Sequence, residues 1–518
     1  MFAMSSPGSL QARITIALSL AALAGCSPVE EVTVTDATDS ETTDETTEGP
    51  TSDPSTSSSD SDTTTIEPTT TTETTDPSET DPTTTGTTDP PPDCDAPDGE
   101  VDDQCDASTP YCVGGSCTDC AGAPDPDAAC AGSDAATPVC DTDQGSCVEC
   151  TVESDALCSG LTPVCDDMSN TCAPCTEHFQ CGDTACDIPT GRCFDEDKVI
   201  FVDKAFEDCD NSDGTLDAPY CNLQGAFDHV VNTDLASAWT VFVAPGTYIQ
   251  GSLITPADSK IALIGDGGKF RVVSSTEEIN SGHLQVDAST IFLADAVLDN
   301  NANEHGLSCM GGFLWIDDSS MKANNRHGLY AVDCGTHIRR SVITLNDRGG
   351  MVLSGEPTLA SIENTFITDN GFSQADFGGV QLSNMAHLDL NYSTVVNNLS
   401  LAASSFQCLN VGSASIRNSI VVGLNPPSLD CADITIDNSA VDEGVDLGAG
   451  NLMATSADIN AWLMENNGTY HAVEMPNNMA SPLMDLAVWS DGDPRYDYDL
   501  DLRPQTDGSP DWAGADVP

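Results

Sequence analysis

The stretch that decides the fold is residues 341–370, which reads SVITLNDRGGMVLSGEPTLASIENTFITDN. It contains two asparagines 24 residues apart, Asn346 and Asn370, each preceded five positions earlier by a small residue. The same repeat extends from about residue 281 to residue 444. The intervals are 23, 22, 24 and 28 residues between Asn301, Asn324, Asn346, Asn370 and Asn398. A repeat of this length is typical of a solenoid, whose coils bury their apolar faces only by stacking.

The small residues form a second row in the same register. They stand at Ala296, Ser319, Ser341, Thr365, Ser393, Ser419 and Ser439. Between them lie short runs in which apolar and polar residues alternate, such as Gly379–Leu382 and Thr365–Thr368. This alternation is strand periodicity, and the runs are too short for helices. The sequence therefore predicts coils of three short parallel strands, with each repeated asparagine at a turn because Asn tolerates the left-handed backbone region.

Two cysteine pairs test this register. Cys408 and Cys431 are 23 residues apart, which is one coil, and Cys309 and Cys334 are 25 apart. Neighbours in stacked coils lie within the Cα separation that a disulfide needs. We therefore predict both pairs as disulfides; the alternative is independent buried thiols.

The flanks of the repeat resemble the right-handed parallel β-helix proteins of the pectate-lyase-like superfamily. Phe201–Asp203, Pro219–Ala226 and Val241–Tyr248 are similar to the usual opening of that fold, and Ser481–Leu483 with Asp501–Pro504 to its close. The resemblance implies an all-β fold: a strand, a short capping helix and a right-handed parallel β-helix over 198–450, then a closing segment over 451–518. The superfamily contains lyases, hydrolases, adhesins and inert stalks, so it does not fix an activity.

Residues 1–26 are predicted to be a targeting segment. Arg13 precedes an apolar run of eleven residues, Ile14–Ala24, which is too short to span a bilayer. Leu23–Cys26 resembles the bacterial lipoprotein cleavage box, and the resemblance implies that Cys26 is lipidated; the alternative is an ordinary signal peptide. We therefore expect a lipoprotein of the bacterial cell envelope, in the outer membrane and facing the exterior, with the membrane as a partner through its lipid.

The next segment, residues 27–93, is rich in Thr, Ser, Asp, Glu and Pro and is predicted to be a disordered tether. The whole chain has a formal net charge of -69, with no Lys or Arg between Arg13 and Arg192. Electrostatic repulsion from this acidic N-terminal stretch excludes nucleic acid as its partner. A polysaccharide or another cell-surface ligand remains as a partner.

Sixteen of the 23 cysteines lie between Cys94 and Cys193, and we predict a cysteine-rich repeat module over 94–197. A Thr-Pro-x-Cys motif recurs three times, each followed by a second cysteine and a CxxC partner, and Cys186 and Cys193 form a truncated fourth unit. Units this small need covalent staples, and export makes disulfides available. The block resembles Cys-repeat modules in surface proteins of predatory and soil bacteria. Zinc at the CxxC pairs is the alternative, and the pairing within a unit stays open.

Cys209 and Cys221 form a further predicted disulfide. They flank an acidic loop with Asp208, Asp210 and Asp213, which faintly resembles a calcium loop. The alternative is a turn closed by the disulfide. No cofactor is firmly indicated, and Ca²⁺ is the candidate for this loop.

Catalytic candidates come from a cluster of basic residues in a chain that has only 15 of them. The candidates are Lys322, Arg326, Arg340 and Arg348, and the nearby Asp317 and Asp318 are further candidate metal ligands. In polysaccharide lyases of this fold, Arg or Lys abstracts a proton beside a uronate carboxylate that cations neutralise. The other interpretation is surface ion pairing on an acidic rod. We therefore expect a surface-displayed binding or structural protein, and keep a lyase or hydrolase of acidic polysaccharides as the alternative.

Overall fold

A computed structural model describes residues 94–517, apart from 152–153, 155–157, 167, 275–281, 373–374, 426–427, 433, 443–449 and 474–479. The predicted targeting segment with Cys26 and the predicted tether over 27–93 lie outside the described residues. Of the helices that are described, none has the length and apolar character to cross a bilayer.

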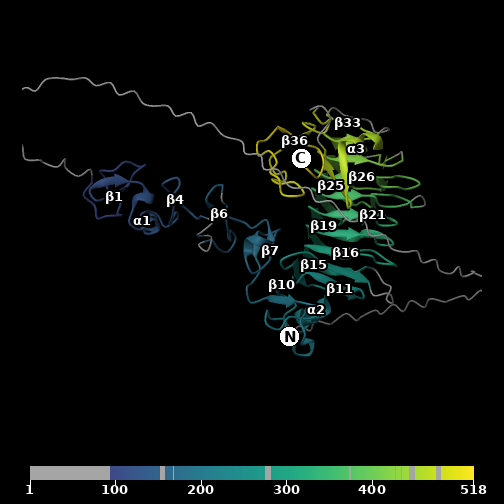
Figure 1. The fold of residues 1–518 in the computed structure, drawn as a ribbon, viewed down its shortest axis with the longest axis horizontal. Helices are drawn as coiled ribbons and strands as arrows, with labels where there is room; N and C mark the ends of the chain where they lie inside the picture. The colour runs from purple at the N-terminus through teal and green to yellow at the C-terminus, as the bar shows by residue number, and fades with distance from the viewer. Residues whose placement is uncertain are drawn as a thin grey trace, which may run out of the picture. The chain divides into compact units, whose positions relative to one another are not determined.

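Residues 199–453 form a parallel β-solenoid, as predicted, and Figure 1 shows its coils stacked one above another. Strands β15 (Leu284–Ala294), β17 (Leu307–Asp317) and β19 (His327–Arg339) are bent and belong to two faces. The bends fall at residues with positive φ: Ala288, Gly311 and Asp333. The long strands therefore turn one corner of the coil without leaving the 15-stranded sheet.

The first face begins at β12 and continues through the first halves of the bent strands. Its other strands are β12 (Leu253–Ile254), β21 (Gly349–Ser354), β24 (Val380–Ser383), β27 (Phe406–Leu409) and β30 (Leu429–Asp430). The second face contains the second halves of the bent strands. Its other strands are β9 (Val199–Val202), β10 (Ala238–Val243), β13 (Lys260–Gly265), β22 (Leu359–Glu363), β25 (His387–Asn391), β28 (Ser413–Arg417) and β31 (Ile434–Asp437).

The third face is a separate ten-stranded parallel sheet. Its strands are β11 (Gly246–Gln250), β14 (Phe270–Ser274), β16 (Ala296–Asp299), β18 (Ser320–Lys322), β20 (Val342–Thr344), β23 (Phe366–Thr368), β26 (Thr394–Val396), β29 (Ile420–Val422), β32 (Ala440–Val441) and β33 (Leu452–Met453).

Columns of apolar side chains fill the interior. One column on the first face is in strict strand register and fully buried: Leu284, Leu307, Leu329, Met351, Val380 and Phe406. Each such side chain contributes on the order of 1.5–3 kcal/mol by leaving water. The chain passes close to itself at the corners, where a Cβ on Gly350 would lie 2.6 Å from the carbonyl oxygen of Gly379.

The repeated asparagines form a buried ladder. The backbone N–H of Asn324 donates to Oδ1 of Asn346 at 3.1 Å, and its Nδ2 donates to the same oxygen at 2.9 Å. The pattern continues from Asn346 to Asn370 and from Asn370 to Asn398. The stated reason for asparagine at this turn was wrong, because the left-handed residue lies one position earlier: Asn300, Ala323, Leu345, Asp369 and Asn397.

The row of small residues is a second ladder. The backbone N–H of Ser319 donates to Oγ of Ser341 at 3.2 Å, and the N–H of Ser393 donates to Oγ of Ser419 at 3.0 Å. Each hydroxyl in turn donates to a carbonyl two residues earlier in its own coil, as Ser341 does to Arg339. At this corner the hydroxyl residues therefore satisfy backbone groups, in addition to saving space.

Both the start of the solenoid and one outer face are covered. Helix α2 (Leu223–Thr233) closes the first coil with four buried side chains, Leu223, Ala226, Phe227 and Val230. The closing segment contains helix α3 and two hairpins that cover the outward side chains of the third face. These elements are α3 (Ser456–Trp462), β34 (Leu463–Asn466), β35 (Thr469–Ala472), β36 (Ala487–Trp489) and β37 (Ser509–Asp511).

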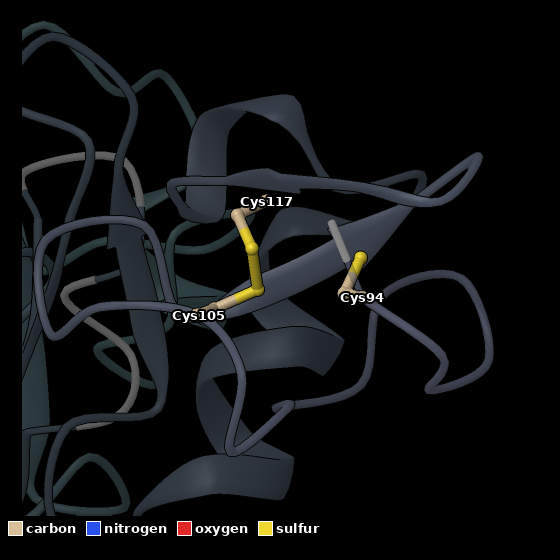
Figure 2. Close-up of side chains that lie close together, drawn as sticks. All are labelled: Cys94, Cys105 and Cys117. Atoms are coloured by element: carbon tan, nitrogen blue, oxygen red, sulfur yellow. A yellow bond between two sulfur atoms is a disulfide. The ribbon is translucent and has the colours of Figure 1, made fainter. Parts of the chain in front are cut away.

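The disulfide-rich module, residues 94–193, consists of four units with one pairing rule: the first cysteine bonds the third and the second bonds the fourth. The pairs are Cys94–Cys112, Cys105–Cys117, Cys120–Cys140, Cys130–Cys147, Cys150–Cys165, Cys158–Cys172, Cys175–Cys186 and Cys181–Cys193. Figure 2 shows the bond from Cys105 to Cys117 with Cys94 beside it. The fourth unit, residues 175–193, has all four cysteines, so its description as truncated was wrong.

Each unit contains a short antiparallel hairpin, with its third and fourth cysteines facing each other across the strands. The hairpins are β1 (Tyr111–Val113) with β2 (Ser116–Thr118), β3 (Val139–Asp141) with β4 (Ser146–Val148), β5 (Val164–Asp166) with β6 (Thr171–Ala173), and β7 (Cys186–Asp187) with β8 (Arg192–Cys193). The second unit adds helix α1 (Pro126–Ser133). The two cysteines of a CxxC motif belong to successive units and bond different partners.

Three further disulfides lie in the solenoid and are the pairs that the sequence predicts. Cys408 bonds Cys431 with a Cα separation of 4.8 Å, and Cys209 bonds Cys221. Cys309 bonds Cys334 across the bend between the first two faces, at a Cα separation of 6.1 Å. That bond is out of strict register because its two cysteines lie on opposite sides of the corner.

The fourth unit lies against the outer surface of the second face. The backbone N–H of Ala185 donates to Oγ1 of Thr240 at 2.9 Å, and Nζ of Lys260 lies 2.6 Å from the carboxylate of Asp187. The ring of Phe194 meets that of Phe292 edge to face at 5.8 Å. Apolar side chains that point away from the interior of the solenoid are therefore buried under this unit.

Candidate functional site

The solenoid distributes the predicted catalytic residues over three places. Lys322 is on β18 in the third face. Arg326 and Arg348 lie on neighbouring coils at the corner between the third and first faces, where the backbone N–H of Arg348 donates to the carbonyl of Arg326 at 2.8 Å. Arg340 is at another corner, directly after β19. Only Arg326 and Arg348 are thus brought together.

The corner that holds Arg326 and Arg348 is exposed and partly neutralised. Nε of Arg326 lies 3.2 Å from a carboxylate oxygen of Glu304, in the coil before it. Both arginine side chains are exposed. Ion pairs of this kind in water contribute little to stability, so the corner is available for contact with a ligand.

Behind this corner lies a stack of aromatic rings. His305 and His327 are parallel with centroids 5.0 Å apart, and Phe377 continues the stack 5.3 Å from His327. Burial lowers the pKa of His305 to about 4, and burial with repulsion from His305 lowers that of His327 to about 3. Both imidazoles are therefore neutral near pH 7 and act as packing groups rather than as cations.

Arg340 belongs to a buried ion-pair network. Its Nη2 lies 2.6 Å from Oε2 of Glu177 and 2.6 Å from Oδ2 of Asp317, and Arg339 binds the same two carboxylates at 2.7 and 2.8 Å. Burial opposes the charge of Arg340, but its hydrogen bonds to Glu177 and the charge of Asp317 outweigh this and raise its pKa. Burial also opposes the charge of Asp317, but the two guanidinium groups hold its pKa below the usual value.

The candidate metal ligands do not gather into one site. Asp208 accepts hydrogen bonds from the side chain of Asn211, and Asp213 accepts from Thr215 in a local turn. Asp210 is an exposed residue of the same loop. Asp317 is held by the two arginines, whereas Asp318 pairs with Nζ of Lys269 at 2.7 Å. The last two carboxylates therefore have cationic partners from the protein itself.

A cavity of about 560 Å³ opens beside this network, at the seam between the fourth unit, the second face and the closing segment. We call it the seam cavity. Its polar lining includes Glu177, His178, Asp295, Asp317 and Asp499. Its apolar lining includes Phe179, Phe242, Ile264, Ala294 and Leu500. This volume is in the range of small-molecule sites.

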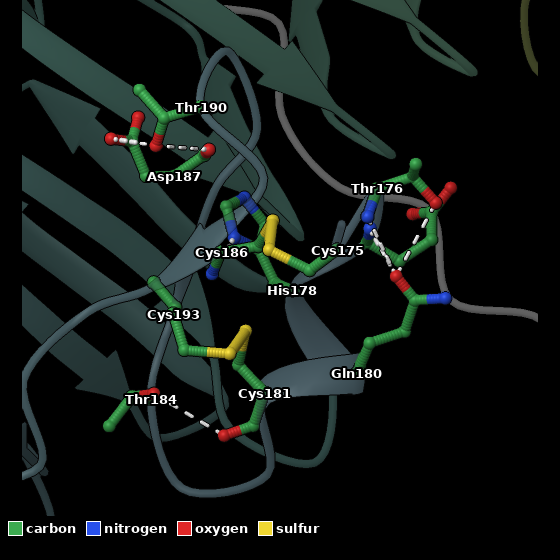
Figure 3. Close-up of a disulfide and its surroundings, with 12 residues drawn as sticks. Cys175, Thr176, His178, Gln180, Cys181, Thr184, Cys186, Asp187, Thr190 and Cys193 are labelled. Atoms are coloured by element: carbon green, nitrogen blue, oxygen red, sulfur yellow. Dashed lines mark hydrogen bonds between the residues drawn. A yellow bond between two sulfur atoms is a disulfide. The ribbon is translucent and has the colours of Figure 1, made fainter. Parts of the chain in front are cut away.

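His178 has an unusual environment in this cavity. It is only 8% exposed, and Nδ1 accepts a hydrogen bond from the backbone N–H of Cys186 at 3.2 Å. Figure 3 shows the ring beside the Cys175–Cys186 disulfide. Burial lowers the pKa of His178 to about 4, so the ring is neutral near pH 7. Because Nδ1 is an acceptor, the single proton is on Nε2, which has no hydrogen-bond partner among the described residues.

Two carboxyl groups in the cavity titrate near neutrality. Burial and the nearby Asp318 raise the pKa of Asp295 to about 6. Burial and a hydrogen bond with Asp516 raise the pKa of Asp499 to about 6. Both groups are therefore mostly ionised at pH 7, so the cavity has negative potential and disfavours anionic ligands.

Sequence reasoning missed most of this cavity. It named Asp317, Asp318 and Arg340, but not His178, Phe179, Asp295 or Asp499. One clue was present, because His178 is the only histidine within the cysteine-rich block. The segments that meet at the seam come from separate parts of the chain and share no repeat; Ala185 and Thr240, for example, are 55 residues apart.

Comparison with known proteins gives likenesses of fold and one family match. No curated protein matches the chain. The solved pectate lyase Pel9A is similar with 15% identity and a TM-score of 0.33 over 61% of this chain and 95% of that chain. A rhamnogalacturonan lyase has 10% identity and a TM-score of 0.27, over 47% of this chain and 74% of that chain. The Escherichia coli protein ybhc has 12% identity and a TM-score of 0.24, over 48% and 73%.

These likenesses say nothing about activity. Within the chain, residues 79–199, which include the whole disulfide-rich module, match the model of a family of unknown function, DUF8331.

Proposed function

We propose that this chain is a lipid-anchored binding and structural protein of the cell surface, which presents a β-solenoid to a glycan, a matrix or another cell. The single observation that carries the proposal is that basic residues of the solenoid form ion pairs with the disulfide-rich module. Arg339 and Arg340 bind Glu177 and so join the disulfide-rich module to the solenoid. Basic side chains in this network serve assembly, since none of their charge is left for a substrate.

The proposed anchor is Cys26, followed by a tether of 67 residues over 27–93. A flexible chain of that length reaches roughly 45 Å, which would hold the folded part clear of the outer membrane. The described cysteines form eleven disulfides, and disulfides on this scale are typical of proteins outside the cytoplasm.

The anchor is tested by labelling expressing cells with radioactive palmitate. The wild-type chain should take up label, and Cys26→Ala should not. Surface display is tested separately by adding protease to intact cells, which should release the folded part of the chain, residues 94–517, from the cells. Label on the Cys26→Ala chain would exclude the anchor, and full protection from protease would exclude display on the exterior.

A second function is a lyase or hydrolase for acidic polysaccharides. The adjacency of Arg326 and Arg348 on one exposed corner is the observation that favours it. A panel of uronate polymers, followed near 235 nm for unsaturated product, tests the lyase, and release of reducing ends tests the hydrolase. Turnover that disappears in Arg326→Ala or Arg348→Ala but survives in Lys322→Ala would establish this function in place of the first.

A further inference from the structure

Two large apolar side chains are exposed to solvent at the rim of the seam cavity. Phe179 is 79% exposed and Leu500 is 59% exposed, and both line the cavity. They come from different parts of the chain, the fourth disulfide unit and the closing segment, and we call them the rim residues. Exposed apolar side chains that gather around one opening, rather than being scattered, are typical of a protein interaction site.

The first rim residue is held on a fixed element. Phe179 belongs to a 3-10 helix, which the Cys181–Cys193 disulfide fixes at its end (Figure 3). The preceding residue, His178, is buried, and its ring meets that of Phe292 edge to face at 6.0 Å. An aromatic side chain presented from such an element loses little conformational entropy when a partner binds it.

The second rim residue is presented by a strained turn. Leu500 has φ 74°, in the left-handed region that disfavours leucine. The fully buried carboxylate of Asp497 holds this turn, because its Oδ1 accepts the backbone N–H groups of Asp499 at 3.2 Å and of Asp501 at 2.8 Å. Strain of this kind is common at binding sites, and here it keeps an apolar side chain in water.

The cavity beside the rim residues is mainly apolar. Its volume is about 560 Å³, and Phe242, Ile264 and Ala294 are part of its lining. That space can take an apolar side chain of a partner. Because the rim residues are mostly exposed, a ligand confined to the cavity would leave much of their surface in water. The occupant should therefore be larger than the cavity, as a segment of a protein is.

Three carboxylates at the same opening select the charge of the partner. Asp295, Asp318 and Asp499 line the cavity, each is at least partly exposed, and we call them the mouth carboxylates. Among the described residues, only Asp318 of the three forms an ion pair with a basic side chain, that of Lys269 at 2.7 Å. Negative charge that is open to solvent attracts a cationic partner and repels an anionic one.

A second copy of this chain and an anionic membrane surface both fit this opening poorly. In a two-fold dimer through the opening, the mouth carboxylates of one copy would meet those of the other. The net charge of -69 makes such a contact repulsive. The negative surface of a membrane would be repelled in the same way. Charge complementarity therefore favours a different, basic protein.

We propose that the seam cavity binds an apolar side chain of a basic partner protein, with Lys or Arg side chains of that partner on the mouth carboxylates and its surface against the rim residues. This inference rests on the proposed function and deepens it, because it names the class of partner that the surface-displayed chain would hold. The fourth disulfide unit and the closing segment each supply one rim residue, so the site exists only when both are docked on the solenoid.

The test uses three synthetic peptides as probes, with isothermal titration calorimetry on the full chain. The first peptide is Gly-Lys-Lys-Leu-Phe-Lys-Lys-Gly, the second replaces Leu-Phe by Ser-Ser, and the third replaces every lysine of the first by glutamate. The first should bind about tenfold more tightly than the second, because only the first can fill the apolar cavity. The third should not bind, because the mouth carboxylates repel it.

Phe179→Ala changes an exposed side chain and should weaken the binding of the first peptide about tenfold without affecting the second. Leu500→Asn should also weaken the binding of the first peptide, and asparagine tolerates the left-handed turn. The matched control is Phe372→Ala, at a 40% exposed phenylalanine elsewhere on the solenoid, which should leave both affinities unchanged.

Four results would overturn the inference. They are a first peptide that binds no more tightly than the second, an equal affinity in wild type and Phe179→Ala, binding of the third peptide, and a wild-type dimer in sedimentation that Phe179→Ala abolishes. Any of them would remove this site but leave the proposed function standing. Failure of palmitate labelling or surface display would remove the proposed function without affecting the calorimetry.

Discussion

Oε2 of Glu177 lies 2.6 Å from Nη2 of Arg340, although the two residues are 163 positions apart in the chain. Their side chains are only 17% and 12% exposed. Glu177 comes from the fourth disulfide unit, whereas Arg340 has a left-handed backbone at a corner of the solenoid, with φ 44°. This contact makes the seam between the two parts a buried, charged interface rather than a flexible hinge.

Replacement of Glu177 by Gln should open this seam. The change leaves Arg339 and Arg340 with one carboxylate between them, and removing one partner from a buried ion pair costs about 3 kcal/mol. We expect the amide of Ala185, which donates across the seam to Thr240, to lose hydrogen-exchange protection. Glu356→Gln, at an exposed glutamate of the solenoid, is the control and should change nothing. Unchanged protection in Glu177→Gln would contradict this role.

Replacement of Asn346 by Ala should destabilise the solenoid. Its Oδ1 accepts from the backbone and side chain of Asn324, and its Nδ2 donates to Met321 and Asn370. The alanine leaves buried groups on both sides unsatisfied, at a cost of about 1–3 kcal/mol for each. Urea unfolding should show a loss of at least about 2 kcal/mol, against little change for the exposed neighbour Asn325→Ala. Equal midpoints in the two variants would show that the ladder is not stabilising.

The coil register could be predicted because it repeats. Asp317 and Arg339 are paired strand neighbours 22 residues apart, and the spacing of the asparagines gives the same offset. The position of the repeated asparagines at a turn was also predicted, although the left-handed position was placed one residue too late. The reason is that the ladder asparagine must direct its own N–H to the next coil, so the preceding residue makes the turn.

The seam could not be predicted in this way. Glu177 and His178 belong to a block with its own repeat, and no period relates that block to the coils. Arg340 was visible in the sequence as part of a basic cluster, but its partner Glu177 was not, so the sequence left both surface ion pairing and catalysis open. The cysteine pairing was hidden for a similar reason, because the four cysteines of a unit permit three connectivities.

Acid should weaken the fold through its buried histidines. An unfolded histidine has a pKa of about 6.5, whereas burial lowers that of His327 to about 3. Below pH 6.5 the imidazole of His327 binds a proton in the unfolded chain but not in the native chain. The free energy of unfolding therefore falls as the pH falls towards 3. His327 alone should contribute on the order of 1.4 kcal/mol per pH unit.

His327→Phe should flatten this acid dependence, since a phenyl ring can occupy the stack between His305 and Phe377 but does not titrate. The measurement is the difference in urea midpoint between wild type and variant from pH 6.5 to pH 4.5. The variant must be compared with the wild type because Asp295 and Asp499 have raised pKa values in the folded chain. These two groups therefore increase stability as the pH falls over this range, which opposes the effect of the histidine. Parallel pH profiles would refute the effect.

The disulfide-rich module should contain neither free thiols nor zinc. All sixteen of its cysteines are paired in the structure, and the CxxC cysteines bond different partners. Alkylation without reductant should therefore leave these residues unmodified by mass spectrometry. A chelator should leave the thermal midpoint unchanged, whereas a reductant should lower it. Eight or more alkylated cysteines, or metal released by the chelator, would favour the zinc alternative.

Leu345→Asn should stabilise the protein, against the usual direction for a change from an apolar to a polar residue. Leu345 has φ 57° and is 56% exposed. It therefore has the strain of a left-handed backbone without the free energy that burial of its side chain would supply. The left-handed region costs a non-glycine residue roughly 1–2 kcal/mol, and asparagine tolerates it better than leucine.

The expected gain is about 1 kcal/mol in the free energy of unfolding. The matched control is Leu359→Asn, at a leucine that is 62% exposed on β22 and is not among the residues with positive φ. Asparagine is disfavoured in strands, so this control should lose about 0.5 kcal/mol. Opposite signs for the same substitution at two leucines of similar exposure would identify the backbone at the turn as the cause, and equal signs would exclude it.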